Sequence, residues 1–198
     1  MSFAIVKNGT PFEISGDFEA NDGALYSSSV LPIWTPQERL SKGIRPIVDG
    51  TIPEGHTVTG SSLTWDGQTV TRVYTTEAIP LADIKAAKQS ALARRRWQAE
   101  EGGTTLGGQP LATDRTTQTK LTAAYIKASA NAGYTIPAWK SGPGVFSSLN
   151  AATIIAAADA IEAHVQACFA NEAALSGEIE AATTIAELSA VDLEASWP

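Results

Sequence analysis

The chain has 198 residues, which is enough for one large domain or two small ones. Hydrophobic residues make up 43% of it, an ordinary share for a folded protein, whereas charged residues make up only 18%. The formal net charge is -7 at pH 7, and residues 151–198 hold eight acidic side chains and no basic one. Proteins that bind nucleic acid normally present a broad basic face. The acidic net charge of this chain therefore argues against a nucleic-acid partner.

Neither a disulfide framework nor a membrane segment is visible in the sequence. Cys168 is the single cysteine, so no intramolecular disulfide can form. Residues 1–9 lack the apolar core of a signal peptide, and the apolar stretch at residues 151–158 is far shorter than the roughly 20 residues that a membrane helix needs. We therefore expect a soluble protein that is made in the cytoplasm and does not insert into a membrane.

The first part of the chain shows the alternation typical of β structure. Asn8-Gly9 follows one alternating segment and predicts a type I′ hairpin, because both turn positions need positive φ. Asp66-Gly67 predicts a second hairpin between Ser61–Trp65 and Gln68–Thr75.

A proline-rich passage lies between the two hairpins. Because proline has no N–H to give to a central strand, we expect edge strands and turns here, with edges that accept an added strand. Thr35 and Pro36 predict a short helical turn with Thr35 as its N-cap. The rigid apolar loop of Pro32, Ile33, Trp34 and Pro36 is the predicted partner-binding site, since rigidity lowers the entropy lost on binding. The rival interpretation is that this loop folds back over its own sheet.

Pro80 marks a change from alternating to helical patterning and predicts a domain boundary at about residues 76–84. Apolar and long side chains recur at three and four residues between Leu81 and Arg95, and Gly102-Gly103 is expected to end this helix. Residues 106–111 then predict a short hairpin or loop.

A second helix is expected to follow, with Thr113 or Asp114 as its cap. Residues 137–149 predict another loop or hairpin, which contains the turn Gly142-Pro143-Gly144. Both loops would connect helices of one compact domain.

Asn150 is expected to cap a long helix, and a last acidic helix is predicted from about Glu178 to Leu188. The residues predicted to face inward on the long helix are Ile154, Ile155, Ala158, Ile161, Val165, Cys168 and Phe169. This placement predicts a buried Cys168 thiol and a large loss of stability when Phe169 is truncated.

Candidates for catalysis or metal binding are few. His164 and Cys168 lie four residues apart, so a helix would turn both to one face, where they could help to hold a metal ion. A zinc site needs more ligands, and Cys168 belongs to the apolar stripe, so we expect the pair to be structural. His56 lies in a polar turn and is expected to be exposed. With no recognisable nucleophile or phosphate loop, the sequence predicts no enzyme activity, no catalytic residue, no metal and no cofactor.

The run of Arg94, Arg95 and Arg96 has three interpretations: pairing with the acidic C-terminal helices, a solvated face, or a ligand site. One helix cannot point three consecutive residues the same way, so at least one arginine must turn toward the fold. Trp97 and Trp139 are expected to lie in the core.

Several short motifs of the second half resemble a domain of unknown function that is common in small proteins encoded beside the tail-fibre genes of tailed bacteriophages. The motifs are Arg95-Arg96-Trp97-x-x-Glu100-x-Gly102, Thr113-Asp114-Arg115-x-x-Gln118, Trp139-Lys140, Phe146-x-x-Leu149, His164-Val165-Gln166-Ala167-Cys168-Phe169-x-x-Glu172, Ile179-x-Ala181-Ala182-Thr183, Glu187-Leu188 and Trp197-Pro198. The resemblance covers about residues 85–198 and implies a tail, fibre or baseplate setting. It carries no catalytic residue over to this chain.

The sequence thus predicts an α+β protein with a β-rich docking domain at residues 1–80 and a helical domain at residues 81–198, the latter with three or four helices and short β-hairpins. The expected function is that of a structural or adaptor component of the phage tail, which binds tail or tail-fibre proteins in the virion after synthesis in the host cytoplasm. Two alternatives stay open: a tail-fibre assembly chaperone, and an enzyme that degrades the host envelope. Oligomerisation within the virion also stays open.

Overall fold

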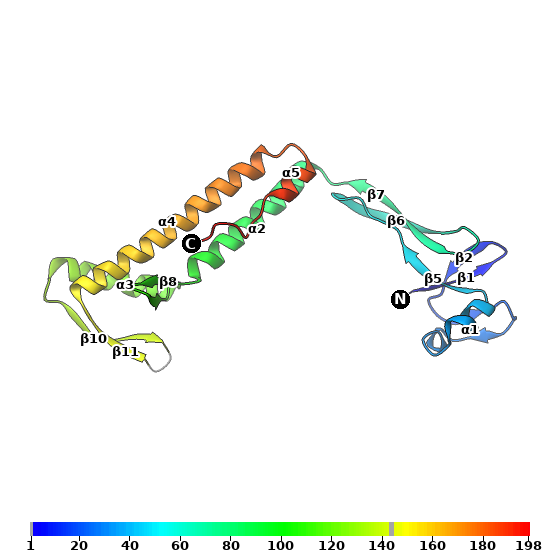
Figure 1. The fold of residues 1–198 in the computed structure, drawn as a ribbon, viewed down its shortest axis with the longest axis horizontal. Helices are drawn as coiled ribbons and strands as arrows, with labels where there is room; N and C mark the ends of the chain where they lie inside the picture. The colour runs from blue at the N-terminus through cyan, green and yellow to red at the C-terminus, as the bar shows by residue number, and fades with distance from the viewer. Residues whose placement is uncertain (1, 143–144) are drawn as a thin grey trace. The chain divides into compact units, whose positions relative to one another are not determined.

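The computed structural model describes residues 2–142 and 145–198 and divides the chain into two compact units, Met1–Pro80 and Leu81–Pro198 (Figure 1). The first unit is rich in β-strands and the second is mainly helical, so the predicted α+β class is confirmed. The predicted turn at Pro143 and Gly144 lies outside the described residues. Across the described ranges, no helix has the length and apolar character needed to cross a bilayer.

The first unit is built on a five-stranded sheet with the strand order β2-β1-β5-β7-β6. Its elements are β1 (Phe3–Lys7), β2 (Thr10–Glu13), β3 (Phe18–Glu19), β4 (Leu25–Tyr26), a 3-10 turn (Ser28–Val30), α1 (Pro36–Ser41), β5 (Ile44–Asp49), β6 (His56–Trp65) and β7 (Val70–Ala78). The pair β5–β7 is parallel and the other ladders of this sheet are antiparallel. Strands β3 and β4 form a small separate hairpin.

Both predicted hairpins of this unit are confirmed. Asn8 and Gly9 have φ values of 51° and 78°, and they join β1 to β2 next to the pair Lys7 and Thr10. The second hairpin joins β6 to β7, and its turn is held by the Asp66 carboxylate, which accepts hydrogen bonds from two backbone N–H groups that follow it. Turn chemistry read from the sequence therefore locates these connections correctly.

The proline-rich passage departs from the prediction, because its strand β5 lies at the centre of the sheet. The physical reason is a change of partner along the strand. Residues Ile44–Pro46 pair with β1, whereas Ile47–Asp49 pair with β7. Pro46 lies just before the ladder to β7 begins, so its missing N–H interrupts no bond to that strand. The outer strands β2 and β6 also contact each other, so the sheet edges are less open than expected.

The second unit is built around two long helices, α2 and α4, which lie side by side (Figure 1). Its elements are α2 (Leu81–Glu101), β8 (Thr104–Leu106), β9 (Gln109–Leu111), α3 (Arg115–Ala130), β10 (Thr135–Gly142), β11 (Val145–Asn150), α4 (Ala151–Ala181) and α5 (Ile185–Ala190). Helix α3 also packs on α4, and β8–β9 and β10–β11 form two antiparallel hairpins. The predicted hairpin at residues 106–111 is therefore present, and Asp114 rather than Thr113 caps α3.

Helix α4 is longer than the sequence pattern suggests. Asn150 caps it as predicted, with the side-chain oxygen accepting a hydrogen bond from the N–H of Thr153 at 2.9 Å. The predicted break near Glu178 is wrong, because α4 continues to Ala181. The next helix begins only at Ile185, where a capping box formed by the preceding threonine and Glu187 provides the start signal.

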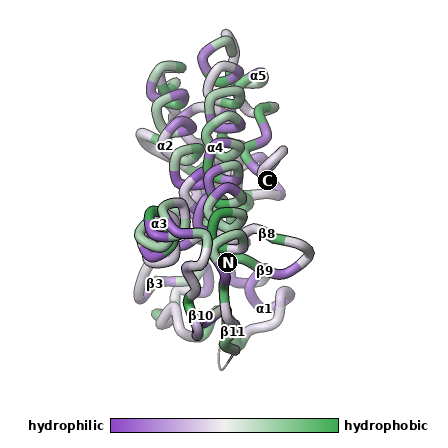
Figure 2. Tube along the Cα trace, turned by 90° about the vertical axis from the view of Figure 1, so that its left-hand side faces the viewer, coloured by the Kyte–Doolittle hydropathy of each residue, from purple (hydrophilic) through white to green (hydrophobic). Residues whose placement is uncertain are grey.

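The buried face of α4 confirms most of the predicted stripe. Ile154, Ile161 and Cys168 are buried, and Ile155 and Val165 pack partly buried against the same core. Apolar residues recur along the helix in Figure 2. The prediction for Phe169 is wrong, since 46% of this residue is exposed. Phe169 lies one position after Cys168, about 100° around the helix, so the two cannot share one narrow face.

Of the two tryptophans predicted to lie in the core, Trp139 does so in part and Trp97 does not. Trp139 packs partly buried against the core between α3 and α4. Trp97 is 47% exposed, so its predicted core position is wrong. It follows Arg96 directly on α2, and the inward positions of that helix are taken instead by Leu92 and Ala99.

Candidate functional site

The four residues predicted to bind a partner lie together in one loop of the first unit, which we call the proline loop (residues 32–36). Pro32 and Pro36 are exposed, and Ile33 is 79% exposed. Trp34 turns the other way and packs partly buried against the core of its own unit. The two large apolar side chains of the loop therefore point in different directions, with Ile33 in solvent and Trp34 against the core.

Trp34 belongs to an aromatic cluster that encloses a lysine. Its ring meets the Tyr26 ring edge-on at a centroid distance of 4.8 Å and the Phe18 ring at 6.5 Å. The Lys42 ammonium lies 4.5 Å from the Tyr26 centroid and 5.2 Å from that of Trp34, a cation–π geometry. The same ammonium donates to the Asp22 carboxylate, and this hydrogen bond is the main cause that lowers the pKa of Asp22 to about 2.

The backbone of the proline loop is braced on both sides. The Arg39 guanidinium donates to the carbonyl oxygens of Leu31 at 2.7 Å and Trp34 at 2.5 Å. Thr35 and Glu38 form a capping box at the start of α1, in which each side chain accepts from the backbone N–H of the other. The loop is thus fixed by its own unit and presents Ile33 on a rigid support.

Sequence reasoning could locate some of these features. The spacing of Thr35 and Glu38 is a capping-box signature that precedes a helix. The role of Lys42 was missed, because its contacts with Asp22 and Tyr26 join residues far apart in the chain and no local pattern indicates them. The inward turn of Trp34 depends on the same long-range cluster.

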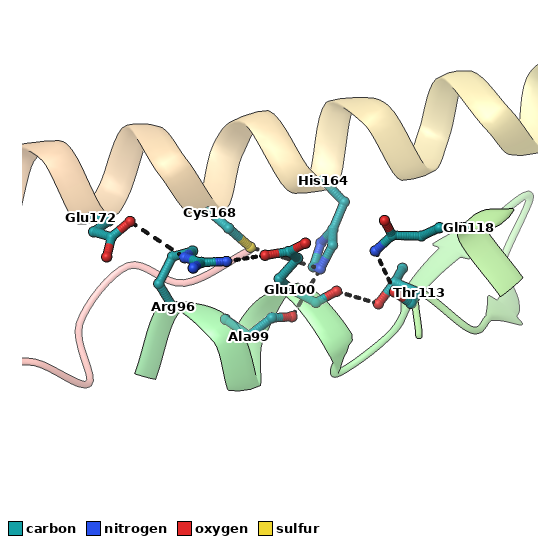
Figure 3. A network of polar contacts seen from close by, with 8 residues as sticks. All are labelled: Arg96, Ala99, Glu100, Thr113, Gln118, His164, Cys168 and Glu172. Carbon is teal, nitrogen blue, oxygen red and sulfur yellow. Dashed lines mark hydrogen bonds and ion pairs between the residues drawn. The ribbon is translucent and has the colours of Figure 1, made fainter. Parts of the chain in front are cut away.

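The second unit contains a buried polar network between α2 and α4 (Figure 3). The Arg96 guanidinium bonds to Glu100 one turn along α2, and its Nε lies 3.3 Å from a carboxylate oxygen of Glu172 on α4. Arg95 pairs with Glu194 at 2.6 Å, whereas Arg94 is exposed. The predicted pairing with the acidic C-terminal helices is therefore confirmed for Arg96, through Glu172 of α4, whereas Arg95 pairs with Glu194, which lies beyond the end of α5.

The network also caps the C-terminal end of α2. The His164 Nε2 lies 2.9 Å from the carbonyl oxygen of Ala99, which can only accept, so this ring nitrogen carries the proton. The Thr113 hydroxyl donates to the carbonyl oxygen of Glu100 and accepts from the N–H of Gly103 at 2.9 Å. Helix ends leave carbonyl groups without intrahelical partners, and these side chains satisfy two of them.

Thr113 is itself held by the start of α3. The Gln118 amide donates to the carbonyl oxygen of Thr113 at 2.7 Å, which ties the segment after the β8–β9 hairpin to α3 (Figure 3). Thr113 is fully buried. Its contacts with α2 and α3, together with the bond from His164 of α4 to α2, link the three helices near the end of α2.

The arrangement of His164 and Cys168 suits packing better than chemistry. The thiol sulfur lies 3.8 Å from His164 Nε2, but that nitrogen already donates to a carbonyl group and offers no lone pair to a proton. Cys168 is fully buried as predicted, and burial raises the pKa of its thiol, which disfavours the reactive thiolate. Within residues 2–142 and 145–198, no three side chains of metal-binding type gather in one place.

His56 is half-buried rather than exposed. It begins β6, and its Nδ1 lies 3.1 Å from the Thr76 hydroxyl on the neighbouring strand. The polar turn before His56 led to the prediction of an exposed ring, but the contact with the neighbouring strand covers the ring in part.

These features define an α+β protein of two units, in which one carries a braced apolar loop and the other contains two long helices, α2 and α4, joined by buried polar contacts. The family model described as Domain of unknown function (DUF4376) matches residues 83–195, more than half of the chain, and the chain belongs to this family. This match confirms the resemblance to a domain of unknown function, while the bacteriophage setting stays a proposal. No curated protein and no solved structure matches the chain.

Proposed function

We propose that the chain is a structural or adaptor protein of a bacteriophage tail, in the fibre or baseplate region, and that it binds other tail proteins through the proline loop of its first unit. The observation that carries the binding role is the 79% exposure of Ile33 on a braced backbone. The phage setting is supported by the motifs of the second unit, such as His164 to Glu172, that resemble small proteins encoded beside tail-fibre genes.

A rigid apolar loop is suited to binding because little conformational freedom is lost when it docks. Arg39 and the capping box already hold the backbone of this loop, and Trp34 supports it from below. Ile33 would then enter an apolar pocket of the partner, with the flanking prolines forming the rim. Trp34 acts as an internal support in this proposal, and Ile33 makes the contact.

The polar groups of the second unit also favour a binding role over catalysis. The histidine and cysteine that a nucleophilic mechanism would need are engaged in packing and in capping α2. A catalytic pair normally keeps at least one group free to exchange a proton with a substrate. This consideration supports a protein that holds partners, and we expect no hydrolysis of envelope polysaccharide or peptidoglycan.

Mass spectrometry of purified phage particles tests the proposal. A structural component should be present in fixed proportion to the tail proteins and should stay bound after the particles are washed in high salt. An assembly chaperone would instead bind a tail-fibre protein in infected cells and be absent from the finished particles. The latter result would contradict the structural role and favour the chaperone.

A further inference from the structure

A groove of about 550 Å³ lies beside the proline loop of the first unit. Pro32, the first residue of that loop, forms part of the groove wall, so a partner that contacts Ile33 would lie next to this groove. The other apolar residues of the wall are Phe3, Ile14 and Leu31. A wall of this kind accepts an apolar side chain, and the polar groups in it decide which ligand binds.

Arg39 is the charged residue of this wall, and the fold uses only part of its guanidinium. Its Nη1 donates to the carbonyl oxygens of Leu31 and Trp34, and its guanidinium carbon lies 4.9 Å from the centroid of the Phe3 ring. Its Nε and Nη2 atoms form no hydrogen bond with any other described residue. Both atoms keep access to solvent, since an unpaired buried nitrogen occurs in the described chain only at Arg96. The guanidinium is therefore held by one edge while another edge is free.

The described residues leave this free edge without a carboxylate. No salt bridge among them includes Arg39. The carboxylate of the neighbouring Glu38 accepts hydrogen bonds from the N–H and the hydroxyl of Thr35 at 2.7 and 2.8 Å. The other polar residues of the groove wall, Ser2 and Ser28, carry only hydroxyl groups. Because the N–H bonds of Nε and Nη2 point the same way and match the two oxygens of a carboxylate, the groove presents a fixed cation that lacks its counter-ion.

We propose that this groove binds a segment of the partner protein in which an aspartate or glutamate lies beside a large apolar residue. The carboxylate accepts hydrogen bonds from Nε and Nη2 of Arg39, and the apolar side chain packs against Phe3 and Ile14. Charge complementarity selects this partner, because a basic segment would be repelled by the guanidinium and a neutral one would leave its free edge unpaired. This inference rests on the proposed function, since it takes the proline loop as the docking surface, and it adds the chemistry of the segment that binds there.

Small ligands test the groove on the full chain without any tail protein. The probe is N-acetyl-leucinate, which carries a carboxylate beside an apolar side chain, and N-acetyl-leucinamide is its uncharged match. The Nε–H signal of Arg39, assigned with the variant Arg39→Lys, is followed by NMR during titration. N-acetyl-leucinate should shift this signal saturably, and the amide should bind at least tenfold more weakly because it lacks the charge-assisted hydrogen bonds. Equal binding of the two, no saturable shift with the first, or tighter binding of inorganic phosphate would overturn the proposal.

A pair of neighbouring substitutions links the groove to the partner. Ser28→Tyr enlarges a residue of the groove wall, whereas Ser29→Tyr enlarges its exposed neighbour, which does not line the groove. Far-UV circular dichroism should show that both variants fold. Ser28→Tyr should weaken binding of N-acetyl-leucinate and of tail proteins isolated from phage particles at least tenfold, and Ser29→Tyr should leave both within about twofold. Equal weakening by the two variants would contradict the assigned groove.

The same measurements separate this inference from the proposed function. If Ile33→Asp weakens binding of the tail proteins while Ser28→Tyr leaves it unchanged, the proline loop docks the partner and the groove does not, so this inference fails alone. If no tail protein binds the chain while N-acetyl-leucinate still shifts the Arg39 signal, the proposed function fails and the carboxylate site remains.

Discussion

Each unit contains a cation that contacts both a carboxylate and an aromatic ring, but the cation has a different structural role in each. In the first unit, Lys42 and Asp22 lie near the surface and fix a loop whose apolar residue stays in solvent. In the second, Arg96 pairs with Glu100 and Glu172 between two helices, and its contact with the Phe169 ring covers it from outside. Charge clusters near the surface can thus prepare a binding surface, whereas those between helices fix packing.

The largest expected effect concerns the helical core. Ile154→Ala removes a fully buried side chain between α3 and α4 and should lower the free energy of unfolding by about 2–5 kcal/mol. Phe169→Ala should cost about 1 kcal/mol or less, because this ring is half exposed. Urea unfolding followed by far-UV circular dichroism compares the two. Equal losses would mean that the buried face of α4 is assigned wrongly.

The next largest loss of stability is expected when the cation of the polar network, Arg96, is removed. Arg96→Met leaves Glu100 mostly buried without its partner and should cost about 2–3 kcal/mol, less than a fully buried pair because both side chains keep some access to water. Arg94→Met, at the exposed position of the same run, should cost less than about 0.5 kcal/mol. The double variant Arg96→Met with Glu100→Met should regain part of the loss. A double variant as unstable as the sum of its single variants would contradict a pairing interaction.

The smallest effect is a dependence on pH in the first unit. Asp22 has a pKa of about 2 in the folded chain against 3.8 for the ordinary group, so its contribution to stability is complete above about pH 4 and is lost as the pH falls toward 2. Asp22→Asn should remove this part of the acid sensitivity, which urea unfolding at several pH values can measure through tryptophan fluorescence. Asp17→Asn, at an exposed position without a salt bridge among the described residues, is the control. If the stability of Asp22→Asn depended on pH in the same way as that of the unchanged chain, the Asp22–Lys42 contact would not be the source of the acid sensitivity.

Local sequence patterns predict the parts of this fold that depend on local chemistry. Asn8-Gly9 locates a hairpin through positive φ, and Asn150 locates the start of α4 through its capping oxygen. Patterns fail where tertiary contacts decide. The central place of β5 depends on which strands it meets. The exposure of Phe169 is a different case, because helical geometry alone separates it from Cys168 and the predicted stripe was drawn too wide.

The candidate site shows the same limit. Pro32, Ile33, Trp34 and Pro36 do form one loop, but only the packing of Trp34 on Tyr26 reveals which apolar residue is left in solvent. The second unit also contains an apolar pocket of about 500 Å³ that the sequence did not predict, because its lining residues come from both hairpins and from α3 and α4.

The proposed function requires that the chain bind a tail protein, and its most direct test measures binding of the full chain to tail proteins isolated from phage particles. Ile33→Asp places a charge at the exposed tip of the proline loop and should weaken this binding at least tenfold without changing the free energy of unfolding by more than about 0.5 kcal/mol. Ile52→Asp, at another exposed apolar position of the same unit, should leave the affinity within about twofold. Unchanged affinity in Ile33→Asp, or equal weakening by both variants, would contradict the assignment of the proline loop as the docking surface.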